Sequence, residues 1–183
     1  LGGLECGYIL AKNGMKVTIL AHEAQVGGCL QTFRRGAALF DTGFHYVGAL
    51  DEGESLHTLF SYFDLMGLPW KKLDEDCFDE VVIGEDTFAF ANKHQRFYER
   101  MAARFPKERD GLKKYVEFLK EVGDRIFSAF SNDGNKQYTY SLLSRSAYEY
   151  LNETIKDPLL RKVLSGTSLK MELNAPTLPL YTF

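Results

Sequence analysis

Several kinds of chemistry are missing from this 183-residue sequence. It has only three cysteines (Cys6, Cys29 and Cys77), and none of them lies in a C-x-x-C pair or at the spacing of metal ligands. It contains no H-E-x-x-H zinc motif and no G-x-S-x-G nucleophile motif. No apolar run approaches the ~20 residues that a membrane-spanning helix needs. We therefore expect reduced thiols and no metal site, and the sequence gives no catalytic residue by motif.

An excess of one charge sign is also missing. The chain has 22 Lys and Arg against 25 Asp and Glu, a net charge of −3. Nucleic-acid-binding proteins usually carry a strongly basic surface, so we expect no nucleic-acid partner. Residues 1–11 lack the basic head and apolar run of a signal peptide, and this predicts a cytoplasmic location.

Aromatic side chains, in contrast, are abundant. Phe, Tyr and Trp make up 14% of the residues within a hydrophobic content of 45%. These rings could fill a protein core, or some of them could line a cleft for an apolar substrate. Composition does not separate the two interpretations.

The first part of the chain has the pattern of a nucleotide-binding α/β unit. Apolar residues recur at helical spacing over residues 3–13, and Gly14 stands where a helix commonly ends in a left-handed residue. The β-branched run at residues 16–20 predicts a buried strand. Helix, glycine turn and strand form the latter part of a βαβ unit, so we expect an incomplete Rossmann-like domain whose first strand is absent from this sequence.

Two glycine pairs are candidates for binding a pyrophosphate. Gly2 and Gly3 stand at the start of the predicted helix, where free backbone N–H groups and the helix dipole favour an anion. Gly27 and Gly28, followed by Thr32, would let a loop approach a phosphate or a planar ring without Cβ atoms in the way. A simple turn is the alternative interpretation of each pair.

Recognition of the ribose should involve an acidic residue after the second strand. Ala21 occupies the expected position, so Glu23 is the candidate ribose ligand. The alternatives are that His22 takes this role, that ribose recognition is weakened, or that His22 and Glu23 form a solvated strand end. Further along, Asp41-Thr42-Gly43 precedes His45 and Tyr46. Gly43 could again let a loop approach a phosphate or a planar ring, and an Asx-type turn beside a structural histidine at His45 is the alternative interpretation.

The remaining sequence is mostly helical. A helix is predicted at 55–67 and a β-hairpin at 78–83 and 87–91 around Gly84-Glu85-Asp86. Helices are also predicted at 93–105 and from Pro106 to about residue 131, with Leu112, Tyr115, Val116, Leu119, Val122, Ile126 and Phe130 on the buried side. A loop at 131–135, helices at 140–155 and 158–164, and an extended segment at 174–179 complete the prediction.

Taken together, these residues resemble the family of phytoene desaturases, carotenoid isomerases and retinol saturases, a branch of the FAD-dependent amine-oxidase-like flavoproteins. The similarity is most specific in residues 3–20, in GGCLQTF at 27–33 and in FDTGFHYVG at 40–48, whose His-Tyr pair is typical of the retinol-saturase-like branch. The resemblance of this last segment implies that Gly43, His45 and Tyr46 lie on the flavin side of the cofactor. The hairpin at 78–91 and the helix that ends at residues 104–106 resemble the start of the family's substrate domain.

The resemblance implies a fold, a cofactor and an activity. It implies a partial FAD-binding domain at residues 1–50, and a partial substrate domain at 51–183 that is largely helical, of α+β type, with a β-hairpin. The parent protein would be an FAD-dependent oxidoreductase that desaturates, saturates or isomerises an apolar, isoprenoid-, carotenoid- or retinoid-like substrate, with NAD(P) as a potential co-substrate. Peripheral membrane contact and homo-oligomerisation of the parent are compatible with this interpretation. An inactive fragment that self-associates and an NAD(P)-dependent dehydrogenase are the alternatives.

Overall fold

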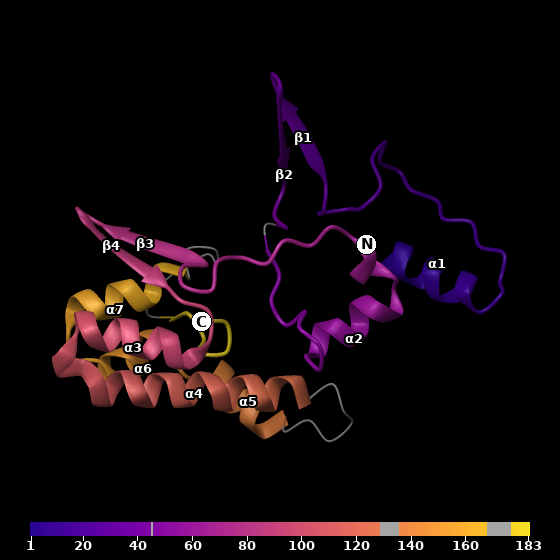
Figure 1. Ribbon diagram of the computed structural model, residues 1–183. Helices are drawn as coiled ribbons and strands as arrows, with labels where there is room; N and C mark the ends of the chain where they lie inside the picture. Colours follow the sequence, from indigo (N-terminus) through magenta and orange to yellow (C-terminus); the bar gives the residue numbers. More distant parts are fainter. Residues whose placement is uncertain (45, 129–135, 168–176) are drawn as a thin grey trace. The chain divides into compact units, whose positions relative to one another are not determined.

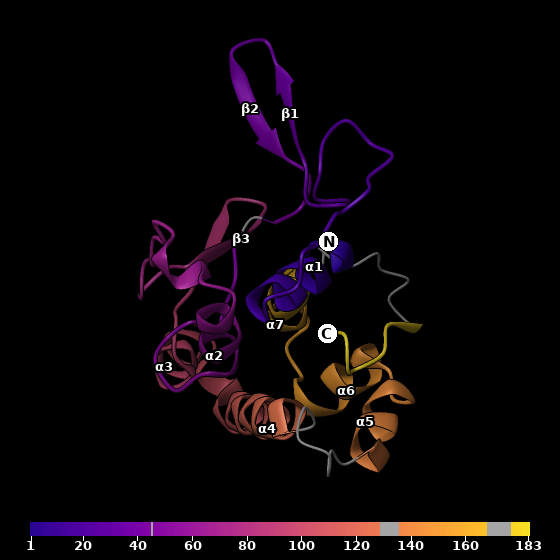
Figure 2. The ribbon, with the colours of Figure 1, turned by 90° about the vertical axis from the view of Figure 1, so that its right-hand side faces the viewer.

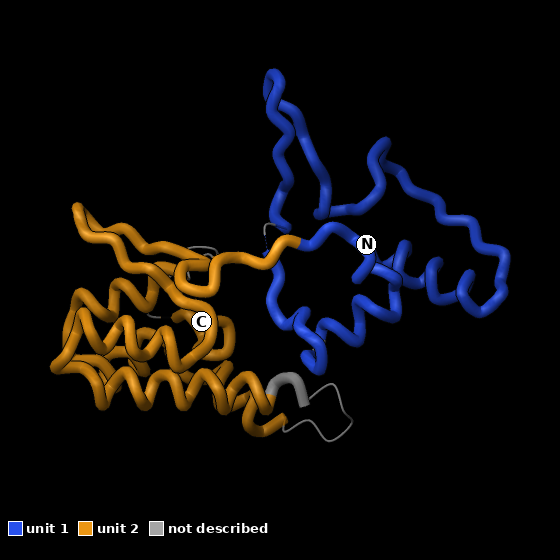
Figure 3. Tube along the Cα trace, in the orientation of Figure 1, with its two compact units in different colours: residues 1–70 blue, residues 71–183 orange. Residues whose placement is uncertain are grey.

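The computed structural model describes residues 1–44, 46–128, 136–167 and 177–183. The chain divides into two compact units, residues 1–70 and residues 71–183 (Figures 1 and 3). The sequence pattern placed the domain boundary between residues 50 and 51.

The first unit consists of short elements around one longer helix. The helix predicted at residues 3–13 is confirmed as α1 (Gly2–Lys12), and Gly14 has the left-handed backbone expected of a helix end, with φ +82°. In both Figure 1 and Figure 2 the β-hairpin of residues 32–41 extends away from the unit's helices. The elements are α1 (Gly2–Lys12), β1 (Thr32–Arg35), β2 (Ala38–Asp41), α2 (Ser55–Tyr62) and the 3-10 turn η1 (Leu65–Gly67).

The strand predicted at residues 16–20 is wrong as a strand, because this segment forms no ladder with another strand among the described residues. A strand is defined by pairing, and local sequence cannot supply the partner. The segment nevertheless packs on α1 as a strand of a βα unit would. A Cβ placed on Gly7 would lie 2.6 Å from Ile19 Cδ1 and 3.5 Å from Val17 Cγ1, so Gly7 allows the close approach of helix and segment.

The antiparallel hairpin of unit 1 pairs Thr32 with Asp41 at its base and Arg35 with Ala38 at its tip. The turn between the strands contains Gly36 with φ +58°, a conformation that favours glycine. All strand residues are exposed, and the Phe33 and Phe40 rings stack at a centroid distance of 5.4 Å. The ladder and this ring pair therefore help to hold the hairpin together.

The helix predicted at 55–67 is interrupted in the structure. Helix α2 ends at Tyr62, and Asp64 adopts a left-handed backbone with φ +57° before η1 begins. Trp70 connects α2 and η1, because its indole Nε1 donates to the Leu65 carbonyl at 2.9 Å and its ring stacks on Phe60. Aspartate tolerates the left-handed region better than most residues, which explains why the helix can break there.

The second unit is a helical bundle with one hairpin, and it confirms most of the sequence prediction. The predicted hairpin, the helix that stops before Pro106, and the start of the next helical segment at Pro106 are all present. Its elements are β3 (Asp79–Ile83), β4 (Asp86–Phe90), α3 (His94–Arg104), the 3-10 turn η2 (Pro106–Glu108), α4 (Arg109–Ser128), α5 (Lys136–Leu143), α6 (Ala147–Thr154) and α7 (Pro158–Ser165).

The single helix predicted at 140–155 is wrong, because the chain forms two helices, α5 and α6, on either side of residues 144–146. Ser146 is the N-cap of α6, and its hydroxyl accepts from the Glu149 amide at 3.4 Å. The Arg145 carbonyl accepts from the Leu180 amide at 2.7 Å, which ties the break to the C-terminal segment. The pattern S-x-x-E at residues 146–149 is a helix-start signature that would have revealed the break.

The hydrophobic core lies in unit 2, and several of the chain's aromatic side chains fill it. Phe88, Phe90, Phe97 and Phe105 are all buried there. The predicted buried side of α4 is also confirmed for the described side chains: Leu112, Tyr115 and Val116 are buried, and Leu119 and Val122 are partly buried. The side chain of Ile126, Phe130, the predicted loop at 131–135 and residues 174–176 of the predicted extended segment lie outside the described residues.

One buried carboxylate connects the helices of unit 2. Glu108 is only 7% exposed, and its two oxygens accept from the amides of Lys156 at 3.2 Å and Asp157 at 2.7 Å. These amides belong to the connection between α6 and α7. Glu108 therefore holds that connection against the start of α4.

We expect Glu108→Ala to lower the free energy of unfolding of unit 2 by about 2 kcal/mol, because two buried amides lose a charged acceptor. Glu117→Ala is the matched control, since the Glu117 side chain is 62% exposed and contacts Lys113 only at 4.0 Å. Urea denaturation of both variants measures the difference. Equal stability of the two variants would contradict the role given to Glu108.

Candidate cofactor-binding site

The N-terminus of α1 presents free backbone donors. The Leu1 carbonyl accepts from the amides of Leu4 at 2.9 Å and Glu5 at 3.1 Å, so the first helical turn closes behind Gly2 and Gly3. Within the described part of the chain, the amides of these two glycines donate to no protein acceptor. A Cβ on Gly2 would meet no atom within 4 Å. The helix end is thus open, and its dipole favours an anion.

The second glycine pair forms a tight turn. The Leu30 amide donates to the Gly27 carbonyl at 3.2 Å, and Gly27 and Gly28 have φ values of +117° and +61°. A Cβ on Gly27 would lie 2.7 Å from the Leu30 carbonyl oxygen. Both the backbone conformation and the available space therefore require glycine at residue 27.

The structure brings the two glycine pairs together. A Cβ on Gly28 would lie 3.4 Å from the backbone nitrogen of Leu1, so the turn lies beside the N-terminus of α1. This is the arrangement expected if Gly2, Gly3 and Gly28 bind one pyrophosphate. The sequence predicted both elements, and the structure adds their proximity.

The other predicted site residues differ in how they are held. Thr32 begins β1, and its hydroxyl lies 3.2 Å from the side-chain amide group of Gln25. Glu23 is exposed, and its carboxylate lies 3.3 Å from Nδ1 of the neighbouring His22, which is itself almost fully exposed. The structure therefore places Glu23 at a solvated bend.

The segment after β2 forms the turn that the sequence offered as an alternative interpretation. The Gly43 amide donates to Asp41 Oδ1 at 3.1 Å, which is an Asx turn. Tyr46 is exposed, and His45 lies outside the described residues. Thr42 was not selected from the sequence, yet its hydroxyl donates to the Cys29 carbonyl and accepts from the Gln31 amide.

Tyr8, Lys12 and Asp64 form a group of polar contacts in unit 1 that was not predicted from the sequence. The Tyr8 hydroxyl donates to Asp64 Oδ2, and Lys12 Nζ lies 3.6 Å from the same carboxylate oxygen and 2.6 Å from the Tyr62 carbonyl. These contacts join α1 to the end of α2. The hydrogen bond from Tyr8 and the charge of Lys12 lower the pKa of Asp64.

The lowered pKa of Asp64 predicts a pH dependence. A carboxyl group whose pKa is lower in the folded chain stabilises the fold above its unfolded pKa, and this contribution is lost as the pH falls through the folded value. We expect Tyr8→Phe to move the pKa of Asp64 back towards its ordinary value, which an NMR titration of the carboxyl carbon measures. An unchanged titration curve in Tyr8→Phe, with Tyr46→Phe as the control, would refute the contact.

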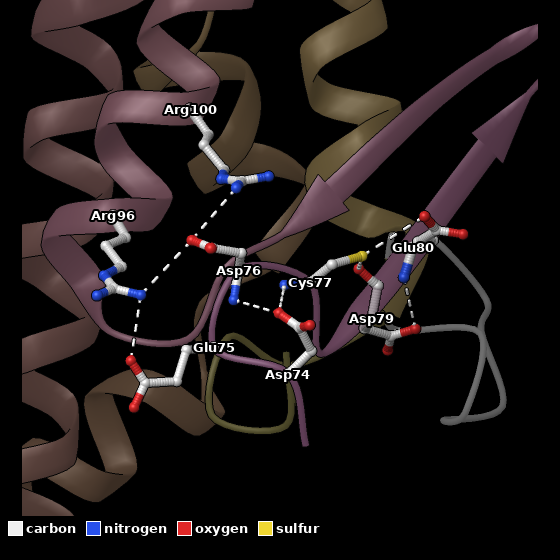
Figure 4. A network of polar contacts seen from close by, with 8 residues as sticks. All are labelled: Asp74, Glu75, Asp76, Cys77, Asp79, Glu80, Arg96 and Arg100. Atoms are coloured by element: carbon white, nitrogen blue, oxygen red, sulfur yellow. Dashed lines mark hydrogen bonds and ion pairs between the residues drawn. The ribbon is translucent and has the colours of Figure 1, made fainter. Parts of the chain in front are cut away.

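Unit 2 contains a polar network around Cys77, shown in Figure 4. Arg96 bridges Glu75 at 3.1 Å and Asp76 at 3.5 Å, and the Cys77 thiol lies 3.5 Å from Glu80 Oε1. Burial and the Glu80 carboxylate raise the pKa of Cys77, so the thiol stays protonated and is a weak nucleophile. Among the described residues, no group of three or more acidic, His or Cys side chains is placed to hold a metal ion.

Unit 2 also has a pocket of about 360 Å³ between α6, α7 and the C-terminal segment. Leu151, Leu178 and Phe183 give it an apolar lining, and Arg161 and Lys162 also line it. The Arg161 guanidinium already donates to the Ile155 carbonyl at 2.8 Å. The volume of the pocket lies at the lower end of the range for ligand pockets, and none of the predicted cofactor-binding residues lines it.

A glycine turn beside a helix N-terminus is typical of proteins with a dinucleotide-binding α/β fold. In agreement, the family described as NAD(P)-binding Rossmann-like domain matches residues 1–63. No solved structure matches the chain. In the described part of the chain, no helix is long and apolar enough to cross a membrane.

Curated relatives make the assignment more specific. The all-trans-retinol 13,14-reductase of Danio rerio is 30% identical over 90% of this chain and 30% of its own length, and that of Homo sapiens is 30% identical over 66% of this chain and 20% of its own. A Danio rerio protein named inactive all-trans-retinol 13,14-reductase is 25% identical over 69% of this chain and 21% of its own. The chain is a homologue of these reductases with a Rossmann-like domain in its first part, which confirms the resemblance to retinol saturases. It spans less than a third of the length of these relatives.

Proposed function

We propose that residues 1–50 bind the pyrophosphate of FAD in an oxidoreductase that acts on a carbon–carbon double bond of a retinoid-like polyene. The proximity of the α1 N-terminus to the turn at Gly27 and Gly28 carries the cofactor part of this proposal. The names of the relatives, all-trans-retinol 13,14-reductases, support the substrate part.

The residues present fit a dinucleotide pyrophosphate. The amides of Gly2 and Gly3 are free donors at a positive helix end, and Gly28 adds a backbone without a Cβ next to Leu1. Thr32 follows the turn and offers a hydroxyl, while Gly43, His45 and Tyr46 follow β2 and are assigned to the flavin side. Glu23 is the assigned ribose ligand. Bound FAD would supply hydride transfer, and this chain would bind and orient it.

Two substrate-side features belong to the same proposal. The largely helical unit 2, with its hairpin, is assigned to the substrate domain of the parent protein, and NAD(P) is assigned as a potential source of reducing equivalents. The catalytic acid or base is not among the residues that we assign. The relatives are named for retinol, an apolar molecule, and unit 2 contains a pocket with an apolar lining that includes Leu151 and Phe183. Both observations support assigning unit 2 to the substrate domain.

The direct test is a titration of the purified chain with FAD, followed by the quenching of flavin fluorescence and by the absorbance of protein after desalting. We expect saturable, 1:1 binding. Titration with NADPH under the same conditions distinguishes a nicotinamide-dependent dehydrogenase, because that alternative predicts tighter binding of NADPH. A chain that binds neither cofactor and elutes as an oligomer would support the inactive, self-associating alternative and refute the proposal.

A further inference from the structure

Thr42 makes a set of contacts that the proposed cofactor ligands do not explain. Its hydroxyl oxygen lies 2.5 Å from the Cys29 carbonyl oxygen and 3.1 Å from the Gln31 amide nitrogen. Its own amide donates to the Gln31 carbonyl at 3.0 Å. Thr42 thus faces Gln31 one position beyond the Thr32–Asp41 pair at the base of the hairpin.

The chemistry of a hydroxyl fits this position. A threonine hydroxyl has one hydrogen to donate and two lone pairs that accept. Its hydrogen can go to the Cys29 carbonyl while the oxygen accepts from the Gln31 amide. One side chain therefore satisfies two backbone groups where the chain leaves the glycine turn and enters β1.

The glycine turn needs such a restraint more than most turns do. Gly27 and Gly28 both have positive φ, and glycine loses more conformational freedom on ordering than any other residue. The turn is closed by one backbone bond, from the Leu30 amide to the Gly27 carbonyl at 3.2 Å. The Thr42 contacts add a second attachment on the far side of the turn, at Cys29 and Gln31.

We propose that Thr42 is a positioning residue that holds the turn of residues 27–31 beside the N-terminus of α1, and thereby sets the affinity for the cofactor's pyrophosphate. This inference rests on the proposed function. The hydroxyl acts through the Cys29 carbonyl and the Gln31 amide and does not contact the cofactor. It makes the base of the hairpin part of the binding site's framework.

The test compares Thr42→Val, which keeps the shape and removes the hydroxyl, with Thr42→Ser, which keeps the hydroxyl. We expect FAD to bind Thr42→Val about tenfold more weakly, because two hydrogen bonds are lost, and Thr42→Ser within about twofold of the unaltered chain. Thr58→Val, an exposed position on α2, is the matched control and should not change the affinity.

A second readout needs no cofactor. Amide hydrogen exchange of Gln31 should accelerate in Thr42→Val and stay slow in Thr42→Ser, because this amide donates to the Thr42 hydroxyl. If the unaltered chain does not bind FAD, the proposed function is refuted, and the exchange rate of the Gln31 amide still tests whether Thr42 holds the turn. The role of Thr42 would be overturned if Thr42→Val bound FAD as tightly as the unaltered chain, or if Thr42→Ser bound it as weakly as Thr42→Val.

Discussion

Replacing Gly27 by alanine should weaken FAD binding about ten- to hundredfold. The backbone φ of +117° is one that residues with a side chain rarely adopt, at a cost of about 1–3 kcal/mol. The new Cβ would also lie 2.7 Å from the Leu30 carbonyl oxygen, a backbone atom that cannot simply rotate away. The turn must therefore change shape, and a free-energy cost of 1.4 kcal/mol corresponds to about a tenfold loss of affinity.

Gly36→Ala is the matched control for this variant. Gly36 also has positive φ, at +58°, but it lies in the hairpin turn and a Cβ there meets no atom within 4 Å. We expect this variant to bind FAD as the unaltered chain does, in the same fluorescence titration. If Gly27→Ala retains full affinity, the glycine turn is not part of the cofactor site.

Leu160→Ala should lower the free energy of unfolding of unit 2 by about 2–5 kcal/mol. Leu160 is fully buried on α7, in the cluster that contains Leu112 of α4 and Ile155 after α6. Its removal costs the transfer free energy of the side chain and leaves a cavity that close-packed neighbours fill only in part. Thermal and urea denaturation followed by circular dichroism at 222 nm measure the loss.

Leu143→Ala provides the comparison, because the same side chain is 42% exposed at the end of α5. We expect this variant to lose less than about 1 kcal/mol. Two variants of similar stability would mean that the buried cluster around Leu160 does not dominate the stability of unit 2.

The sequence predicted those elements whose signals are local. Gly14, Pro106 and the Gly84 turn mark the ends of helices and the hairpin, and the structure has them where the pattern indicated. Where an element depends on a distant partner, local reasoning was insufficient. Residues 16–20 have the composition of a strand, yet composition provides no neighbouring strand with which to pair.

The candidate site shows the same division. Glycine pairs are visible in a sequence because glycine favours a positive φ and leaves backbone N–H groups open to a phosphate, so Gly2, Gly3, Gly27 and Gly28 could be selected directly. The proximity of Gly28 to Leu1 depends on the path of the chain between them. Thr42 was not selectable because a threonine beside a turn is common, and only its partners, Cys29 and Gln31, distinguish it.

The position of Trp70 has a practical consequence. It is the only tryptophan in the chain, and it stacks on Phe60 within unit 1, whereas the helices of the buried core all belong to unit 2. Tryptophan emission will therefore report on unit 1, and far-ultraviolet dichroism will be dominated by unit 2. Unfolding curves from the two signals will therefore show whether the two units unfold together, since coincident curves are the mark of a two-state transition.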